Sequence, residues 1–308
     1  MIKKITLDEN YSRAKLVKKE KPTLCPYTRD MEPNQDEFET VFFPSDGNKR
    51  VKTEGYFKKS YKNKPLISII TVVFNEEKRL EETILSVLNQ TYDNVEYIII
   101  DGGSSDGTMD IIKTHEDKID YWVSEKDEGI YDAWNKGVKS SNGEWIGFVS
   151  AGDCYLPDAL ENYVACINQA CTIDYISSKN ILCNDDKKFL RTIGSAWKWD
   201  VFKRFMNVAH VGSLHNQKLF DTYGLYDTRF RICGDYELLL RAGSSLKTLF
   251  LNHITCMMRV GGISDGGLEV FKEAYKAKTI HKSRGVYQAK VDMLIAIIKW
   301  FIRQKIWY

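Results

Sequence analysis

The sequence predicts an α/β fold in which helices flank a mostly parallel sheet. The run LISIITVVF, residues 66–74, is continuously apolar and rich in β-branched residues, as expected of a strand covered on both faces. The run VEYIII, residues 95–100, has the same character, and helical spacing of apolar residues follows each run. Strands that alternate with helices imply right-handed crossovers and parallel pairing.

Composition and charge narrow the class of protein. The 308 residues suffice for one large domain or two ordinary ones. Because 44 basic residues nearly balance 42 acidic ones, the net charge of +2 gives no field that would favour nucleic acid. The seven cysteines include no C-x-x-C pair, which argues against a disulfide framework or a zinc site. A reducing cytosol fits this cysteine usage, and the charged N-terminus has no secretory h-region.

We expect three segments along the chain. Residues 1–64 are rich in Lys, Glu, Asn and Asp, and we expect an N-terminal extension that packs on or flanks the core. Residues 65–267 carry the alternating strands and helices of the main domain. Residues 268–308 change to a purely helical pattern.

The elements of the main domain can be followed in order. After the first strand, Asn75 is suited to cap a helix, and Glu76 favours the positive end of the helix dipole. The apolar residues of this helix recur on one face, at Leu80, Ile84, Leu85 and Leu88. After the second strand, an Asp-Gly-Gly turn and a polar cap at 104–106 precede a short helix. Two further strands, at 119–124 and 144–150, enclose a helix with an apolar face formed by Ile130, Trp134 and Val138.

Polar side chains follow three of these strands. Asn75 and Glu76 come after the first strand, Asp101 ends the second, and Asp153 follows the strand at 144–150. In open α/β sheets ligands bind at the carboxyl ends of the strands, so we expect these side chains to share one rim. No G-x-G-x-x-G opens the first helix and no G-x-x-x-x-G-K-[ST] occurs, so dinucleotide and P-loop cradles are not predicted.

An ordinary tight turn is an equal alternative for Asp101 taken alone. The glycines that follow, Gly102 and Gly103, can adopt positive φ, and an aspartate satisfies backbone donors in such turns. The functional interpretation therefore depends on the three loops taken together.

Five motifs in order carry a family resemblance. They are PLISIITVVFNEEKRLEETILSVLNQTY, EYIIIDGGSSDGT, SEKDEGIYDAWNKGV, GEWIGFVSAGDCYLP and FRICGDYELLLRAG. Over about residues 65–264 the chain resembles family 2 glycosyltransferases of the GT-A fold, and among them bacterial enzymes of surface-polysaccharide assembly. The resemblance implies a Rossmann-like, mostly parallel sheet flanked by helices, with C-terminal helices added, and a nucleotide-sugar donor.

The resemblance implies a set of donor-binding residues. Asp101 would accept a hydrogen bond from the base, since a carboxylate can take the imide N–H of uracil or the N–H groups of guanine. Asp132 and Asn135, one helical turn apart, could reach the donor sugar or pin their helix. The full implied set is Val73, Phe74, Asn75, Glu76, Asp101, Gly102, Asp132, Asn135, Ser150 and Gly152.

The resemblance implies that Asp153 is the aspartate that lies beside the metal ion in this family. Many relatives carry D-x-D-D where this chain has Ser150-Ala151-Gly152-Asp153, so a single carboxylate remains. One carboxylate can hold Mg²⁺ or Mn²⁺ if the donor diphosphate and water supply the other oxygens. The alternative is a helix cap before the helical pattern that starts near residue 156.

Asp235 sits where the family places its general base, at the start of a helix. Inverting transfer needs a group that takes the proton of the acceptor hydroxyl. A capping role for Asp235, or Glu237 as the base, are the alternatives, although Glu237 should point elsewhere on a helix. His215 and Gln217 are cleft candidates through the family's His-x-Gln pattern; a hydrogen-bonded structural role is the alternative for a lone histidine, and His210 lies in the same segment.

The C-terminal residues 286–308 combine apolar and basic side chains. They fall short of the roughly 20 apolar residues of a membrane span. An interfacial helix on the inner face of the cytoplasmic membrane, near a lipid-linked acceptor, is one interpretation. Packing on the catalytic domain or in a homo-oligomer is the other.

These observations and the resemblance predict an inverting glycosyltransferase that moves one sugar from a nucleotide-sugar donor to a saccharide or lipid-linked acceptor, and the resemblance favours a UDP-sugar as the donor. The absence of Q-x-x-R-W, the mark of processive relatives, favours single transfer. A catalytically silent sugar-nucleotide or glycan-binding relative is the alternative, motivated by the reduced Asp153 motif. A sugar-1-phosphate nucleotidyltransferase would need a Gly-rich basic loop where this chain has FNEEKR.

Overall fold

The computed structural model describes residues 15–16, 58–170, 172–262 and 267–307. Most of the expected extension at 1–64 therefore lies outside the described residues. Two of its residues form β1 (Lys15–Leu16), which pairs antiparallel with β4 at one edge of the sheet.

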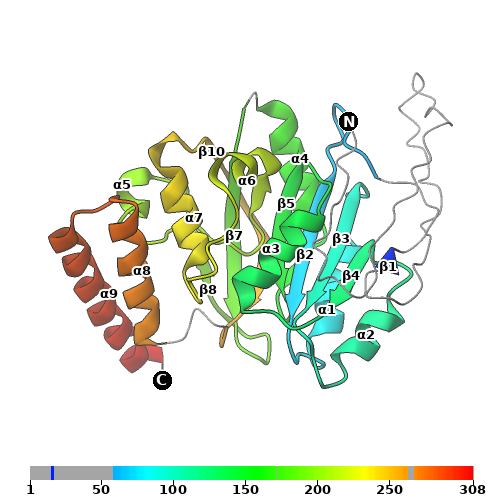
Figure 1. Cartoon of the computed structure of the whole chain (residues 1–308), viewed down its shortest axis with the longest axis horizontal. Helices are drawn as coiled ribbons and strands as arrows, with labels where there is room; N and C mark the ends of the chain where they lie inside the picture. Colours follow the sequence, from blue (N-terminus) through cyan, green and yellow to red (C-terminus); the bar gives the residue numbers. More distant parts are fainter. Residues whose placement is uncertain (1–14, 17–57, 171, 263–266, 308) are drawn as a thin grey trace.

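Four strands form the parallel half of the sheet (Figure 1). They are β2 (Ile67–Val73), β3 (Val95–Asp101), β4 (Tyr121–Ser124) and β5 (Trp145–Ser150). Their order is β4-β3-β2-β5, with every neighbour parallel. Every residue of β2 is buried, as its uninterrupted apolar run predicts.

The other half of the sheet is mixed, and the motifs did not predict it. Beyond β5 the order continues β9-β7-β10-β6, and β8 pairs with β7. The strand β9 is antiparallel to both β5 and β7, whereas β7 and β10 are parallel. The bounds are β6 (Cys154–Tyr155), β7 (Tyr175–Cys183), β8 (Phe189–Ile193), β9 (Leu214–Asn216) and β10 (Thr248–Arg259).

Helices cover both faces of the sheet (Figure 1). Because side chains alternate along a strand, Ile69 of β2 packs in the core beneath α1 and α4, and Ile70 packs in the core beneath α3 and α7. The helices are α1 (Leu80–Leu88), α2 (Thr108–Thr114), α3 (Ile130–Ser140), α4 (Ala159–Gln169), α5 (Trp199–Phe202), α6 (Gln217–Tyr223), α7 (Gly234–Ala242), α8 (Leu268–Ile280) and α9 (Val286–Trp307), with the 3₁₀ turn η1 (Gly243–Ser245).

The first helix begins later than the sequence predicts. Asn75 has a φ of 52° and does not cap a helix, because an N-cap takes an extended conformation. Its side-chain oxygen instead accepts the Ser105 N–H at 2.8 Å. The helix α1 begins at Leu80, and Val87 rather than Leu85 completes its buried face.

The two C-terminal helices form a hairpin beside α7 (Figure 1). A buried carboxylate anchors it: Asp292 of α9 is 0% exposed and pairs with Arg204 at 3.2 Å and Arg284 at 2.9 Å. Lys278 of α8 lies 4.0 Å from the same carboxylate, and burial lowers its pKa to about 8 despite that charge. Among the described helices, none has both the length and the apolar character that a membrane crossing requires.

Candidate active site

The carboxyl ends of the four parallel strands are level. Val73 of β2 pairs with Asp101 of β3, and Asp101 pairs in turn with Ser124 of β4. On the other side, Val72 pairs with Ser150 of β5. The loops that follow these strands therefore meet at one rim, as the strand pattern predicts.

An exposed aromatic ring lies at the β2 side of this rim. Phe74 is 60% exposed, and a methyl group added at Gly102 would lie 3.4 Å from its ring and 2.5 Å from Asp127 Oδ2. Asp127, which no sequence motif indicated as a site residue, thus also belongs to the rim. Because Gly102 has no side chain, the Asp127 carboxylate can approach the backbone there, and the Phe74 ring stays open to a ligand on its exposed side.

Hydrogen bonds brace the two loops that carry this surface. The Asn75 N–H donates to Ser104 Oγ at 2.7 Å, and the Glu76 N–H donates to Thr108 Oγ1 at 3.0 Å. The buried Val73 contributes its carbonyl, which accepts the Gly102 N–H at 2.9 Å. The Glu76 carboxylate lies 3.6 Å from Arg79.

Asp101 is fully buried, and its carboxylate holds the β3–α2 turn. Its Oδ2 accepts the Gly103 N–H at 3.1 Å, the Ser104 N–H at 3.0 Å and the Ser124 hydroxyl at 2.6 Å. Its Oδ1 accepts the Ser104 hydroxyl at 2.5 Å. These are the hydrogen bonds that the tight-turn alternative predicts for Asp101. The role that they show for its carboxylate is to fix the β3–α2 loop.

Asp153 lies at the end of β5 and is only 9% exposed. Its Oδ1 accepts the backbone N–H of Arg259 at 3.0 Å, and Gly152 beside it has a φ of +98°. Burial raises the pKa of Asp153 to about 7, although Arg259 opposes this shift. The helix-cap alternative is wrong, because α4 begins at Ala159 and its N-cap residue is Asp158.

The residues around Asp153 offer an ion few protein ligands. Within the part of the chain that the structure describes, no group of three or more His, Cys, Asp and Glu side chains could hold a metal. The nearby carboxylate of Glu82 is paired with Arg259 at 2.7 Å. An ion at Asp153 would therefore take most of its oxygens from a ligand and water, which suits a hard divalent cation shared with a diphosphate.

Asp235 is connected to the rim by a hydrogen bond from Tyr131 of α3. It lies in the first turn of α7 and is half-buried; its Oδ1 accepts the Tyr131 hydroxyl at 3.1 Å and the Tyr236 N–H at 2.8 Å. Tyr131 lies in the first turn of α3, directly after the loop that ends β4. Burial, with the charge of Asp235 added, raises the pKa of the Tyr131 hydroxyl, which therefore stays protonated. Oδ2 has no partner among the described residues.

His210 is the histidine on the Asp235 side. Its Nε2 lies 2.9 Å from the Tyr226 hydroxyl, and its ring stacks on Phe148 with centroids 5.2 Å apart. Burial lowers the pKa of His210, and the charge of Asp235 opposes this effect. The feature of the sequence that marks this position of His210 is Gly212, two residues later. Its φ of +78° turns the chain back along β5.

His215 and Gln217 do not face the rim, so the expectation for them is wrong. Because β9 is antiparallel to β5, the chain from residue 214 onward runs away from the rim. His215 pairs with Ile146, and Gln217 begins α6 beyond the amino end of β5. His215 is 0% exposed, and neither ring nitrogen has a hydrogen-bond partner among the described residues. It is a core side chain packed among aromatic rings.

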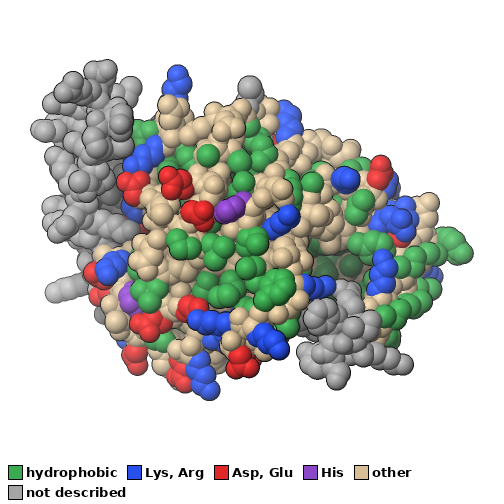
Figure 2. Space-filling view, turned by 180° about the vertical axis from the view of Figure 1, so that it is seen from behind, with side chains coloured by type: hydrophobic (Ala, Val, Ile, Leu, Met, Phe, Trp, Pro, Cys, Tyr) green, Lys and Arg blue, Asp and Glu red, His purple; other side chains and the backbone are tan. Residues whose placement is uncertain are grey.

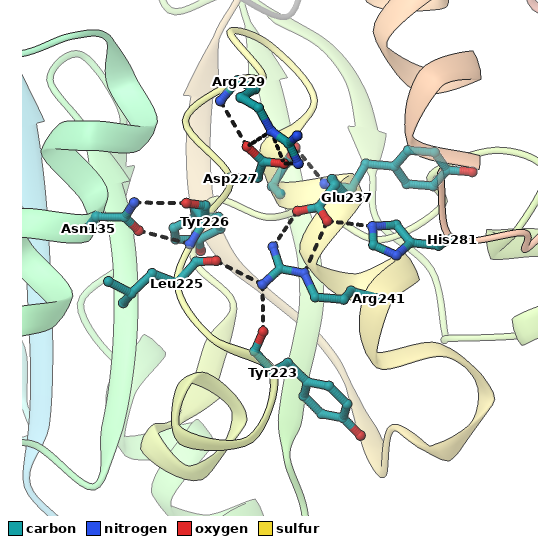
Figure 3. Close-up of polar contacts among 11 residues, drawn as sticks. Asn135, Tyr223, Leu225, Tyr226, Asp227, Arg229, Glu237, Arg241 and His281 are labelled. Atoms are coloured by element: carbon teal, nitrogen blue, oxygen red, sulfur yellow. Dashed lines mark hydrogen bonds and ion pairs between the residues drawn. The ribbon is translucent and has the colours of Figure 1, made fainter. Parts of the chain in front are cut away.

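Of the two roles considered for Asn135, contact with the donor sugar or fixing of its helix, the structure shows the second. Its amide nitrogen donates to the Tyr226 carbonyl at 2.9 Å, and its amide oxygen accepts the Tyr226 N–H at 2.9 Å (Figure 3). Both polar atoms are thus engaged with backbone. Asp132 lies nearer the rim, where its Oδ2 accepts the Glu128 N–H at 3.1 Å and lies 3.4 Å from Lys136.

Glu237 is a structural residue. It is 2% exposed, forms an ion pair with Arg241 at 2.5 Å, and lies within hydrogen-bond distance of His281 Nε2 at 2.5 Å (Figure 3). Arg241 also donates to the carbonyls of Tyr223 and Leu225. Because both oxygens of Glu237 are engaged in this network, Asp235 is the carboxylate of α7 that can meet a substrate.

Comparison with known proteins gives a family and several relatives. The family model for "Glycosyl transferase family 2" matches residues 68–216, a range that ends before Asp235. A PGL/p-HBAD biosynthesis glycosyltransferase of Mycobacterium bovis is 29% identical over 210 residues, which cover 65% of this chain and 80% of the relative. An uncharacterized glycosyltransferase of Rickettsia typhi is 31% identical over 188 residues, 56% of this chain and 57% of the relative.

Solved structures show the same fold at low identity. S. aureus TarS 1–349 in complex with UDP-GlcNAc has a TM-score of 0.59 at 15% identity, covering 74% of this chain and 70% of that one. The match spans 39% of the length of the longer TarS chain. The mannosyltransferase PcManGT of Pyrobaculum calidifontis, in complex with GDP-Man and Mn²⁺, has a TM-score of 0.53 at 15% identity, with 75% and 70% covered. The GT-A-type α/β fold is confirmed.

The raised pKa of Asp153 predicts how one substitution changes stability with pH. The carboxyl stabilises the fold fully below its unfolded pKa of 3.8, and this contribution is lost as the pH rises through about 7. Asp153→Asn stays neutral and can still accept the Arg259 N–H. In metal-free buffer at pH 8 it should be more stable than the parent by about 1 kcal/mol or more, with the difference closing near pH 4.

Urea unfolding of both proteins across this pH range measures the difference. Asp186→Asn, which changes an exposed carboxylate, is the control and should track the parent. A variant that is less stable than the parent at pH 8 would contradict the raised pKa of the buried Asp153 carboxyl.

Proposed function

The chain belongs to glycosyl transferase family 2, and on that premise we propose that this glycosyltransferase moves one sugar from a nucleoside-diphosphate sugar to an acceptor hydroxyl with inversion. The donor is a UDP-sugar, and the acceptor is a saccharide or lipid-linked glycan in bacterial polysaccharide or glycolipid assembly. The observation that carries the proposal is the position of Asp235, which Tyr131 ties to the rim where the four parallel strands end.

The nucleotide base would lie on the exposed face of Phe74, next to the turn that carries Asp101 and Gly102. Phe74 offers an exposed ring for stacking, and the glycine at 102 lets Asp127 approach this edge of the ring. Asp101 Oδ1 accepts only the Ser104 hydroxyl among the described residues, so it keeps capacity for a uracil imide N–H once that hydroxyl turns aside. The TarS complex with UDP-GlcNAc supports a UDP donor, whereas the PcManGT complex contains GDP-Man.

The diphosphate would lie at the end of β5. Asp153 would hold a Mg²⁺ or Mn²⁺ ion together with diphosphate oxygens, and Ser150 and Gly152 would border it. When bound, such an ion neutralises negative charge that develops on the departing diphosphate. The Mn²⁺ in the PcManGT complex supports this assignment. Asp132, with one carboxylate oxygen close to Lys136, would border the donor sugar.

Asp235 would act as the general base. Tyr131 and the Tyr236 N–H both hold Oδ1, which leaves Oδ2 for the acceptor hydroxyl. As the acceptor oxygen bonds to the anomeric carbon, its proton passes to Asp235, and the bond to the diphosphate breaks with its electron pair on the diphosphate oxygen. Attack from the face opposite the leaving group inverts the anomeric centre.

An apolar face on α9 would bring the enzyme to the inner surface of the cytoplasmic membrane. Exposed apolar side chains recur every three or four residues along the helix, at Tyr287, Val291, Leu294, Ile298, Phe301 and Ile302. In Figure 2, hydrophobic side chains run along this outermost helix, with Lys and Arg side chains close by. The exposed charges on its described part, Lys290 and Lys299, are basic, whereas Asp292 is buried. This combination fits an anionic lipid surface.

The base assignment predicts the effect of Asp235→Asn. Loss of the proton acceptor should lower donor hydrolysis or transfer by at least about 100-fold, with UDP affinity unchanged, because the nucleotide pocket is formed by other loops. Release of UDP from a panel of UDP-sugars, and UDP titration calorimetry, measure the two effects. Asp200→Asn, at a side chain 88% exposed on α5, should behave as the parent.

Two other outcomes are informative for the proposed chemistry. Near-parental turnover by Asp235→Asn would overturn the base assignment. A parent protein that binds UDP yet releases none from any donor or acceptor mixture would favour the catalytically silent alternative.

The membrane assignment predicts a loss of lipid binding on changing the apolar face. Leu294→Glu with Ile298→Glu should abolish flotation of the full chain with vesicles of phosphatidylglycerol and phosphatidylcholine, because both side chains are more than half exposed and need no repacking. Lys187→Glu, a change of exposed charge far along the chain, is the control. Unchanged flotation, or a parent that forms dimers and ignores vesicles while the double variant is monomeric, would contradict the membrane assignment.

A further inference from the structure

The turn that leads into α7 receives its cap from a distant helix. The N-cap residue Cys233 makes no side-chain hydrogen bond to α7, and its thiol lies 3.4 Å from the Val270 carbonyl of α8 instead. The N–H groups of the residues before α7 must therefore find an acceptor outside their own segment.

Glu273, on α8, is that acceptor. Its Oε1 accepts the Arg231 N–H at 2.8 Å, and its Oε2 accepts the N–H groups of Ile232 at 2.8 Å and Cys233 at 2.9 Å. Three successive backbone N–H groups thus converge on one carboxylate, which is the arrangement in which a peptide turn binds an anion. The negative charge also lies at the positive end of the α7 dipole.

The same turn is tied to the base on its other side. The Ile232 carbonyl accepts the Tyr131 hydroxyl at 2.7 Å, and that hydroxyl lies 3.1 Å from Asp235 Oδ1. The residue Ile232 is therefore held at its N–H by Glu273 and at its carbonyl by Tyr131. A shift of this turn would move both the start of α7 and the Tyr131 contact that orients Asp235.

We propose that Glu273 is a positioning residue for sugar transfer: from the C-terminal hairpin it fixes the turn at 231–233 and so holds the Asp235 carboxylate toward the acceptor hydroxyl. This inference rests on the proposed role of Asp235 as the base. Glu273 itself touches no substrate. Its removal should therefore act on the chemical step and leave the nucleotide pocket at the ends of β2 and β3 unchanged.

Kinetics of Glu273→Ala in the full chain test the proposal. We expect kcat to fall by about ten- to a hundredfold, with the KM for the UDP-sugar and the affinity for UDP within twofold of the parent. Glu273→Gln keeps one oxygen acceptor and the side-chain volume, and should recover part of the rate. Glu269→Ala, one turn earlier on α8 at a side chain 63% exposed and paired with Lys272, is the matched control and should keep the parental kcat.

Combination with Asp235→Asn separates positioning from general destabilisation. If Glu273 acts through the base, adding Glu273→Ala to Asp235→Asn should lower kcat no further, because the group to be positioned is already lost. A parental kcat in Glu273→Ala, or equal losses in the presence and absence of Asp235, would overturn the inference while leaving the proposed function intact. An active Asp235→Asn enzyme would instead remove the proposed base itself.

Discussion

Parallel pairing of β2 with β3 and β5 is the constraint on which the rest of the structure depends. These strands are buried on both faces, so their backbone polar groups must pair with one another, and the pairing fixes their register. The register sets Val73 beside Asp101 and Val72 beside Ser150. The residues that we assign to the base and the diphosphate lie at these level ends or in the loops that follow them.

The proposed base, Asp235, lies at the same rim but comes from a later part of the chain. Asp235 belongs to a helix that follows the mixed half of the sheet, and Tyr131 of α3 connects it to the loop after β4. Below this contact, Asn135 holds the backbone of Tyr226, while Glu237 and Arg241 fix the chain near Tyr223 and Leu225. The polar groups of α3 and α7 thus divide into those that hold the scaffold and those left for substrate.

Local sequence patterns were sufficient for the parallel strands and for the helices α3 and α7, because apolar periodicity and strand propensity are properties of neighbouring residues. Strand direction is not such a property. Nothing in the sequence around His215 indicates that β9 is antiparallel to β5, and that direction carries His215 and Gln217 away from the rim. The left-handed conformation of Asn75 and the cap that Glu273 gives to a turn some 40 residues earlier in the chain are likewise set by tertiary contacts. The division of the chain at residues 64 and 267 stays a prediction.

Thermal unfolding of the full chain with UDP, GDP, ADP and CMP, each with and without Mn²⁺, is a direct test for a nucleotide-sugar site, because a ligand that binds only the folded state raises its stability. We expect that UDP raises the unfolding temperature, that Mn²⁺ increases the shift, and that Asp153→Asn removes the Mn²⁺-dependent part alone. No shift with any of the four nucleotides, with or without Mn²⁺, would contradict a nucleotide-sugar site at the ends of these strands.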